Sequence, residues 1–313
     1  MAGCTPASHE PVLLHEAVNG LQVALGDRFI DATFGRGGHS REILAMLRPG
    51  AELLVLDRDP DAIKEAQAVA SRDPRVHVAH VPFSEIGRVA SEMGWSQTVA
   101  GILFDLGVSS PQIDSAERGF SFQLDGPLDM RMNPASGLSA AQWINSVPES
   151  ELANVIYRFG EERYSRRIAK KIVQARQQAS IETTGSLAEI VKQAHPKWEK
   201  SKHPATRTFQ AIRIFINNEL DQIRAALEQS VDLLATGGRL AVISFHSLED
   251  RIVKQFFARQ CRGDDLPRDL PVTSEHLQPR LKRVGKAIRP GAREVEQNPR
   301  ARSAILRVVE KLR

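Results

Sequence analysis

The chain of 313 residues has little cysteine, and its two residues, Cys4 and Cys261, lie far apart. Two such thiols form neither a disulfide framework nor the paired spacing of a zinc site, so we expect both to stay reduced. The nine histidines are scattered without ligand spacing, which argues against a metal. No apolar run approaches the length of a membrane span. Because residues 1–11 are polar and proline-containing rather than apolar, as a secretory signal would be, we expect a cytoplasmic protein.

Charge, by contrast, is plentiful and unevenly distributed. The net charge is only +4, but residues 1–157 hold 11 Lys or Arg against 20 Asp or Glu. Residues 158–213 hold 13 basic groups against 5 acidic ones, and residues 262–313 hold 13 against 7. Two basic blocks in one chain favour a nucleic-acid partner, whose phosphates such blocks neutralise. A solvated helical face would explain either block alone.

The first third of the chain alternates short apolar runs with helix-like segments. The runs are rich in β-branched and aromatic residues and cover residues 28–30, 53–56, 76–81 and 99–104. Helices are expected over residues 40–47 and 61–70, the second opened by Pro60. This alternation predicts the βαβ units of an α/β, doubly wound parallel sheet.

The alternation stops after Phe104, and residues 115–203 contain no convincing strand. Capping-box patterns at Ser139 with Gln142 and at Ser186 with Glu189 predict helices there. One helix, over residues 162–178, is expected to bury Ile168 and Ile172. Its other face is cationic and carries Arg163, Arg166, Arg167, Lys170 and Lys171.

The α/β pattern returns with a long helix over residues 206–234, a stop at Gly237 and Gly238, and a strand over 240–245. A helix over 247–259, a proline-rich basic loop and a last strand over 304–309 follow. We therefore expect a discontinuous domain of residues 1–114 and 206–313, with an all-helical domain inserted at residues 115–205.

The most informative motif is the turn from Asp31 to His39, which packs three glycines into four positions after the first strand. Such a turn lets the backbone approach a ligand closely. Asp57 ends the next strand, 18 residues past His39, where a carboxylate suits hydrogen bonding to a ribose diol. Together the two features predict an adenosine-bearing cofactor.

Dehydrogenases and methyltransferases share this kind of turn, but its details favour the second class. The third glycine of the dinucleotide pattern is replaced by Ser40, and Asp31 precedes the turn. A carboxylate there can receive the cationic amino-acid end of S-adenosyl-L-methionine. Phe83 and Asp105, at further strand ends, are placed to flank an adenine ring. The alternatives are core packing for Phe83 and helix capping for Asp57 and Asp105.

Seven blocks of the sequence resemble the bacterial small-subunit ribosomal RNA cytosine-N4 methyltransferase family, known as MraW or RsmH, over nearly the whole chain. They cover residues 34–40, 105–112, 117–122, 126–132, 203–214, 244–253 and 298–303. The resemblance implies a class I, Rossmann-like, S-adenosylmethionine-dependent methyltransferase. It further implies methylation of the exocyclic N4 amine of a cytidine in the decoding region of 16S rRNA. Carried over position by position, cofactor contacts fall on Gly37, Gly38, His39, Asp57, Phe83, Asp105 and Gln112.

The residue that orients the cytosine amine is left open by the sequence. Many amino-methylating enzymes place Asp, Asn or Ser before a Pro-Pro-aromatic run, but here Asp105 is followed by Leu-Gly-Val. Asp105, Ser109 and the carbonyls of residues 106–110 are all candidates, because each can accept from the amine. Phe120, Phe122 and Trp143 are candidates for stacking on an unpaired base, with core packing as the alternative.

Four arginines are candidate phosphate anchors, with internal ion pairing, for example to Glu219, as the alternative. They are Arg207, Arg213, Arg300 and Arg302. Two other functions remain compatible with the pattern. One is a nicotinamide-dependent oxidoreductase, and the other is an RNA-binding ribosome-assembly factor that retains a vestigial cofactor pocket.

Overall fold

The computed structural model describes residues 11–196, 203–263 and 278–313. Cys4 and most of the expected proline-rich basic loop lie outside these ranges. The chain forms two compact units. Unit 1 comprises Met1–Gly107 and Asp221–Arg313, and unit 2 comprises Val108–Leu220. The boundaries inferred from the sequence, at residues 115 and 205, both lie inside unit 2.

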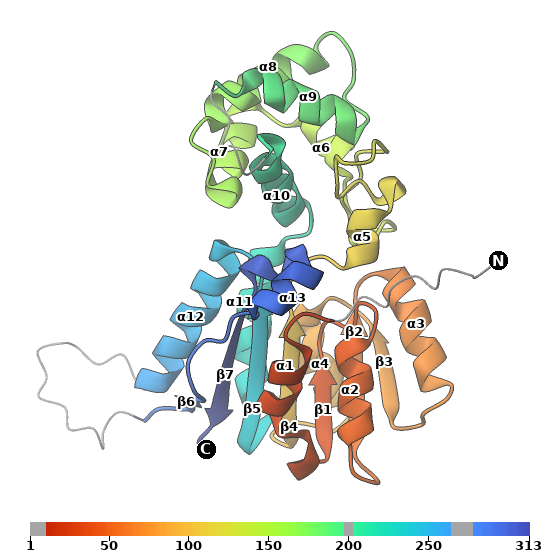
Figure 1. Cartoon of the computed structure of the whole chain (residues 1–313), viewed down its shortest axis with the longest axis vertical. Helices are drawn as coiled ribbons and strands as arrows, with labels where there is room; N and C mark the ends of the chain where they lie inside the picture. Colours follow the sequence, from red (N-terminus) through yellow and green to blue (C-terminus); the bar gives the residue numbers. More distant parts are fainter. Residues whose placement is uncertain (1–10, 197–202, 264–277) are drawn as a thin grey trace, which may run out of the picture. The chain divides into compact units, whose positions relative to one another are not determined.

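Unit 1 is built on a seven-stranded sheet of order β3-β2-β1-β4-β5-β7-β6 (Figure 1). Strands β1 to β5 are parallel, whereas β7 runs antiparallel between β5 and β6. The strands are β1 (Arg28–Asp31), β2 (Glu52–Asp57), β3 (Val76–His80), β4 (Val99–Asp105), β5 (Leu234–Ser244), β6 (Leu281–Arg283) and β7 (Ile305–Lys311). The predicted doubly wound sheet is confirmed, with an antiparallel pair at one edge.

Helices cover both faces of this sheet, as the burial of alternate strand residues requires. Phe29, Leu53 and Leu103 pack on one face against α1 (Leu14–Leu21), α2 (Gly38–Met46) and α3 (Pro60–Ala70). Their neighbours Ile30, Leu54 and Ile102 are equally buried but point the other way. The opposite face is covered by α4 (Ile86–Glu92), α11 (Glu219–Leu233) and α12 (Ser247–Arg262).

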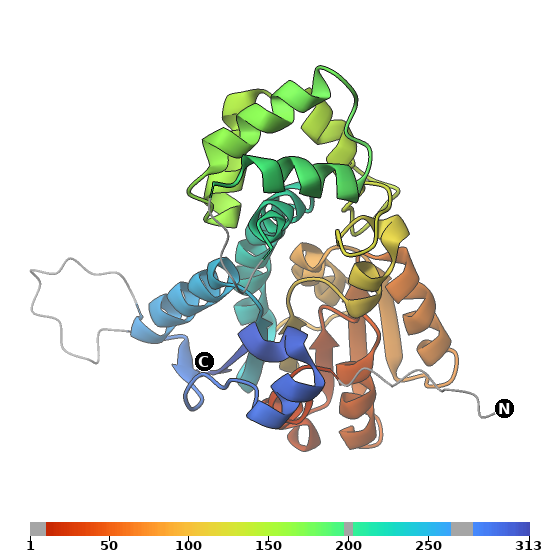
Figure 2. The same cartoon turned by 45° about the horizontal axis from the view of Figure 1, so that its top comes forward.

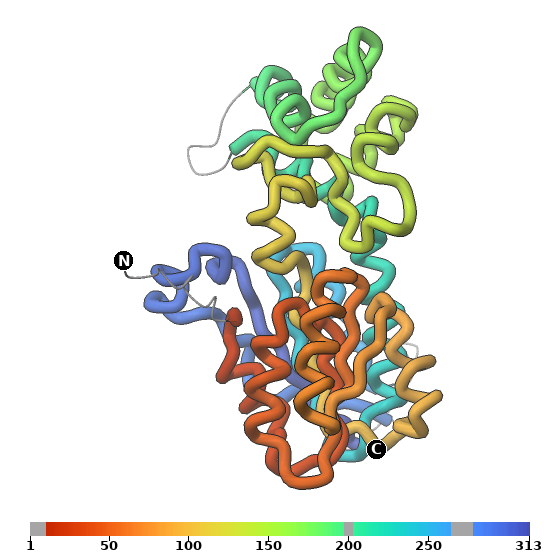
Figure 3. The backbone as a smooth tube through the Cα atoms, turned by 90° about the vertical axis from the view of Figure 1, so that its right-hand side faces the viewer, coloured from red at the N-terminus to blue at the C-terminus, as the bar shows by residue number. Residues whose placement is uncertain are grey.

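The first crossovers follow one another along the sheet, drawn in red and orange in Figure 3. Helix α3 begins as predicted, with Pro60 in its first turn, and the Asp59 side chain accepts the Asp61 N–H at 3.0 Å. Helix α2 starts at Gly38, two residues before the predicted Ser40, because Gly37 caps it with φ of 68°.

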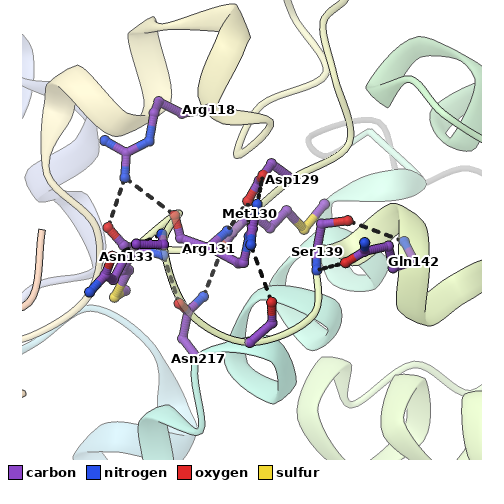
Figure 4. A network of polar contacts seen from close by, with 11 residues as sticks. Arg118, Asp129, Met130, Arg131, Asn133, Ser139, Gln142 and Asn217 are labelled. Carbon is purple, nitrogen blue, oxygen red and sulfur yellow. Dashed lines mark hydrogen bonds and ion pairs between the residues drawn. The ribbon is translucent and has the colours of Figure 1, made fainter.

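The predicted helix over residues 206–234 is wrong, because the structure contains two helices there, α10 (Ala205–Ile216) and α11. Asn218 adopts a left-handed φ of 49°, which asparagine tolerates better than most residues. The preceding Asn217 is buried, and its side chain bonds to a loop instead of solvent (Figure 4). These contacts end α10 at Ile216, where the sequence pattern predicts an uninterrupted helix.

The predicted helix stop at Gly237 and Gly238 is also wrong, since both glycines lie inside β5. Val99 of β4 pairs with Leu234, but Gly101 pairs with Arg239, so β5 carries extra residues between the two pairs. Gly237 has φ of 80°, the conformation that such a bulge requires and glycine supplies. β6 was not anticipated; it is a three-residue edge strand whose Lys282 and Arg283 are exposed.

The connection to β7 contains two short elements. They are α13 (Ala292–Gln297) and the 3₁₀ turn η4 (Pro299–Ser303). Three other 3₁₀ turns lie at Val23–Leu25, Phe83–Glu85 and Ala116–Arg118. No helix among the described residues is long and apolar enough to cross a membrane.

Unit 2 is helical, and in its described residues the only β-type contact is the isolated bridge between Pro127 and Thr183. Helix α10 packs against α6, α7 and α9, and α8 packs against α7 and α9 (Figure 2). The remaining helices are α5 (Ser110–Asp114), α6 (Ala140–Ser146), α7 (Glu149–Gly160), α8 (Ser165–Arg176) and α9 (Thr184–Ala194).

Of the two predicted capping boxes, the one at Ser139 and Gln142 is present and opens α6 (Figure 4). The one at Ser186 is wrong, because Thr183 caps α9 and its hydroxyl accepts the Ser186 N–H. The predicted cationic helix is α8, shorter than expected, with Ile168 and Ile172 buried as predicted.

A long irregular segment between α5 and α6 is held by polar contacts (Figure 4). Arg118 donates to the carbonyls of Arg131 and Met132, and Arg131 forms a bidentate pair with Asp129. Asn217 accepts the Met132 N–H and donates to the Met130 carbonyl, both at 2.8 Å. The loop therefore has a defined shape without regular secondary structure.

We expect Asn217→Ala to lower the free energy of unfolding by about 3 kcal/mol, because it leaves two buried loop groups, the Met132 N–H and the Met130 carbonyl, without their partner. Urea denaturation followed by circular dichroism measures this loss. Asn154→Ala, at an exposed position of α7, is the matched control and should change stability by less than about 0.5 kcal/mol. Equal stability of the two variants would show that the loop is not anchored through Asn217.

Candidate active site

The carboxyl ends of β1, β2 and β4 bring three aspartates to one edge of the sheet. Asp31 pairs in register with Val55 and with Leu103. Asp57 and Asp105 lie two residues beyond these partners, so all three carboxylates share one face and one edge. This is where open α/β sheets bind ligands.

The glycine-rich turn is tied to this edge by backbone groups. The Phe34 N–H donates to the Leu56 carbonyl at 3.0 Å, and the Gly35 N–H donates to Asp57 Oδ2 at 2.8 Å. Asp57 Oδ1 accepts the Asp59 N–H at 2.9 Å. The predicted ribose-binding carboxylate thus also shapes the turn, and each of its oxygens keeps a further lone pair for a ligand.

The two predicted cradle glycines tolerate no side chain. A Cβ on Gly37 would stand 2.5 Å from the ring of Phe34, and its φ of 68° is left-handed. A Cβ on Gly38 would stand 2.1 Å from Pro11 Cγ. Phe34 and Pro11 therefore pack against the start of α2 more closely than any residue with a side chain would allow.

Asp31 is buried, and its carboxylate accepts hydrogen bonds from residues at both ends of the turn. Its Oδ2 accepts the Ser40 hydroxyl at 2.6 Å and its Oδ1 accepts the Thr33 N–H at 3.1 Å. Burial raises the pKa of Asp31 from 3.8 to about 6, because the hydrogen bonds only partly offset desolvation. Ser40, which breaks the dinucleotide pattern, is therefore the hydroxyl that holds this carboxylate.

The carboxylate of Asp105 accepts almost no hydrogen bonds from the protein. Its backbone N–H donates to Thr33 Oγ1 at 2.6 Å, but its carboxylate Oδ1 is buried without a partner. Its Oδ2 lies 3.6 Å from Nδ1 of His39, which is 5% exposed. Burial, with Asp31 and Glu249 adding negative charge, raises the pKa of Asp105 well above its usual range. A ligand that brings a cation or an N–H donor would satisfy this group.

Glu249 is a site residue that the sequence analysis missed. It is fully buried in the first turn of α12, where its Oε2 accepts the N–H groups of Phe245 and His246. In the described parts of the chain, no Lys or Arg forms an ion pair with Asp31 or Asp105. This edge of the sheet is therefore strongly acidic. The signal in the sequence was the His-x-x-Glu capping pattern that directly follows the apolar strand.

Phe83 opens the turn after β3, and its ring meets Phe104 edge-on at 5.7 Å between centroids. The ring is only partly buried. This position agrees with the predicted stacking role without testing it.

Ser109 and Gln112 belong to unit 2, whereas the other predicted cofactor residues belong to unit 1. The Gln112 side chain is buried and accepts the Ser109 N–H at 2.9 Å at the start of α5. This contact follows from the Ser-x-x-Gln spacing, a capping pattern that the sequence analysis passed over at this site.

The predicted base-stacking residues differ in exposure. Trp143 is buried and stacks on Phe215 in the core of unit 2, so packing explains it. Phe120 and Phe122 are half-buried, and Phe122 lies against His203 at 4.7 Å. These two remain candidates.

The four candidate phosphate anchors differ in their ion pairs and in their exposure. Arg213 forms a bidentate pair with buried Glu219 at 2.8 and 2.9 Å, which realises the alternative of internal ion pairing. Arg207 lies 3.7 Å from buried Glu162 but remains partly exposed. Arg300 and Arg302 are exposed on η4.

The cluster of Asp31, Asp105 and Glu249 repels the diphosphate of a dinucleotide and attracts a sulfonium cation. The sheet order, the glycine cradle and this charge define a class I, Rossmann-like methyltransferase that uses S-adenosyl-L-methionine. The nicotinamide-dependent alternative is not favoured.

Comparison with known proteins supports this class. Residues 6–312 match the model of the MraW methylase family, and the chain belongs to that family. It is 56% identical over 306 residues to "Ribosomal RNA small subunit methyltransferase H" of Nitrosococcus oceani, covering 97% of each chain. It is 52% identical over 310 residues to the protein of the same name from Pseudoalteromonas atlantica, covering 98% of this chain and 99% of that one. A solved rRNA methylase from Streptococcus thermophilus gives a TM-score of 0.44 at 11% identity, over 99% of this chain and 100% of that one.

We expect Asp105→Asn to stabilise the cofactor-free protein at pH 8. The pKa of Asp105 is higher in the folded than in the unfolded state. The protein therefore loses stability as the pH rises from the unfolded pKa to the folded pKa, and above the folded pKa the whole cost of burying the ionised carboxylate is present. Asparagine carries no such penalty, and the carboxylate has no donor to lose. Thermal unfolding should show a gain at pH 8 that shrinks towards pH 5. The control is Glu296→Gln, at an exposed position, and a pH-independent gain would contradict the explanation.

Proposed function

We propose that this protein transfers a methyl group from S-adenosyl-L-methionine to the exocyclic N4 amine of a cytidine in the decoding region of 16S rRNA, within the small ribosomal subunit. The observation that carries the proposal is the acidic cluster at the sheet edge, where Asp105 has an unpartnered oxygen. Full-length identity of 50–56% to proteins named for small-subunit rRNA methylation supports the substrate. Such a substrate also supports residence in the cytoplasm.

The cofactor supplies an electrophilic methyl group on a sulfonium. In this proposal Gly37 and Gly38 let the backbone approach it, Asp57 accepts from its ribose, and Phe83 stacks on its adenine. His39, Asp105 and Gln112 complete the set of contacts. The fit rests on the glycine turn, which has no room for side chains, and on the acidic cluster of Asp31, Asp105 and Glu249.

The cytosine amine is conjugated with its ring, so it needs an acceptor that holds an N–H and directs the lone pair towards the methyl group. Of the two side-chain candidates, Asp105 suits this role better than Ser109. Its Oδ1 has no other partner, and burial keeps its pKa raised, which makes its carboxylate the stronger proton acceptor. Asp105 would also take the proton that the methylated amine must lose.

Helix α8 offers a surface suited to RNA phosphates. All five of its predicted cations are exposed, and among the described residues none forms an ion pair with an acid. Arg166 and Arg167 lie in the first turn of α8 and Arg163 directly precedes its N-cap, so all three lie where the helix dipole is already positive. This arrangement costs stability in the free protein and is relieved when phosphate binds.

The reaction is tested with purified protein, labelled methyl donor and 30S subunits from cells that lack this activity. We expect label on a single cytidine, at N4, when the RNA is digested and its nucleosides are separated. Asp105→Asn should lower kcat by at least about 100-fold, because removing one aligned charged group from a transition state costs that much or more. Label on another base or on protein would contradict the proposal.

The RNA surface is tested by changing Arg166, Arg167, Lys170 and Lys171 to Gln together. RNA affinity should fall, and the slope of log K against log salt should shrink by about 3, since each lost phosphate contact removes 0.7 to 0.9. The matched control neutralises four cations that are paired with acids in unit 1: Arg48, Lys64, Arg88 and Arg224. In filter binding, the α8 variant should show the smaller salt slope and the weaker RNA affinity, whereas the control variant should resemble the wild type. Equal salt slopes would assign the α8 face to solvation alone.

A further inference from the structure

The position of the protons on His39 can be deduced from its contacts. Nε2 lies 3.2 Å from the carbonyl oxygen of Val12, which can only accept, so Nε2 carries the N–H. Burial lowers the pKa of His39 to about 4, so the ring is neutral and has a single N–H. Nδ1 therefore carries a lone pair.

That lone pair faces a second acceptor. Nδ1 is 3.6 Å from Asp105 Oδ2, while Oδ1 of the same carboxylate is buried without a partner. The charged groups that act on Asp105 from the packed elements are Asp31 of β1 and Glu249 of α12, both acidic, besides His39 of α2. Two acceptors face each other in a negative environment, and a single proton between them removes the repulsion.

We propose that His39 and Asp105 hold one shared proton in the cofactor-free enzyme, carried on Asp105, and that the positively charged methyl donor displaces it. The proton leaves to solvent as the donor's cation takes over the neutralisation of the acidic pocket. This inference rests on the proposed use of S-adenosyl-L-methionine.

The consequence is selection by ligand charge. The donor carries a sulfonium cation, whereas the demethylated product, S-adenosylhomocysteine, carries a neutral thioether at the same atom. A proton that the cation expels can return when the sulfur becomes neutral. The ratio of donor affinity to product affinity should therefore increase as the pH rises. The increase should stop at the pH where Asp105 is already ionised in the free enzyme.

Two substitutions separate the members of the pair. Asp105→Asn removes the titrating group and should fold, because the carboxylate has no donor to lose. His39→Gln keeps an N–H that can reach the Val12 carbonyl but removes the Nδ1 lone pair, so it should weaken proton binding without removing it. His15→Gln, at an exposed position of α1, is the matched control.

The test is titration calorimetry of each variant with donor and, separately, with S-adenosylhomocysteine, without RNA, between pH 6 and 8.5. Running each titration in phosphate and in Tris gives the number of protons released, because the buffers differ in ionisation enthalpy. We expect the wild type and His15→Gln to release up to about one proton with donor, and fewer with the product. The ratio of donor to product affinity should rise by up to about tenfold per pH unit.

His39→Gln should shift the proton release to lower pH. Asp105→Asn should abolish it at pH 7.5 and above, where Asp31, with its pKa of about 6, is already ionised. Donor binding without proton release in the wild type would overturn this inference alone. Equal release with donor and product would overturn the charge selection. Failure of the donor to bind at any pH would overturn the proposed cofactor, and this inference with it. If His39→Gln does not fold, the wild type and Asp105→Asn still decide between these outcomes.

Discussion

The register of the parallel strands brings three carboxylates to one edge of the sheet without a positively charged partner. The chemistry of unit 1 depends on this clustering of negative charge. Asp31 pairs across the sheet with Val55 and Leu103, which commits Asp57 and Asp105 to the same face of the same edge. A one-residue slip in either pairing would turn one of these carboxylates to the opposite face. Thr33, Ser40 and the backbone of the turn hold the carboxylates, but in the described chain they bring no full positive charge. The strand register thus brings the carboxylates together without providing a positive charge to balance them.

Such an arrangement destabilises the folded state and prepares it for its ligand. Burial favours the neutral form of each carboxyl group, as the raised pKa values of Asp31, Asp57 and Asp105 indicate. The turn is equally specialised, since Gly37 and Gly38 leave no room for a side chain. Binding free energy and folding free energy are therefore coupled at this edge: what is unfavourable in the empty pocket becomes favourable with a cation in it.

Strand positions and strand ends were predictable from sequence because apolar runs and acidic residues report directly on a buried parallel sheet. The features that sequence reasoning missed depend on contacts between distant residues. The helix break at Asn217 arises from bonds to Met130 and Met132, more than 80 positions away, and no local pattern announces it. The bulge in β5 likewise reflects the pairing of Gly101 with Arg239. Glu249 gave a capping signal, but only the folded sheet reveals that it lies near Asp105.

The division of the chain between its units has a consequence for biosynthesis. Unit 2 is one continuous segment, whereas unit 1 needs residues on both sides of it. Strands β4 and β5 are adjacent in the sheet but separated in the chain by all of unit 2. During translation the helical unit can fold from local contacts as soon as it leaves the ribosome, while the half-built sheet must wait for β5 to cover the open edge of β4. The acidic edge of the sheet is therefore completed only after all of unit 2 has been made, although its glycine turn is among the first parts of the chain to be made.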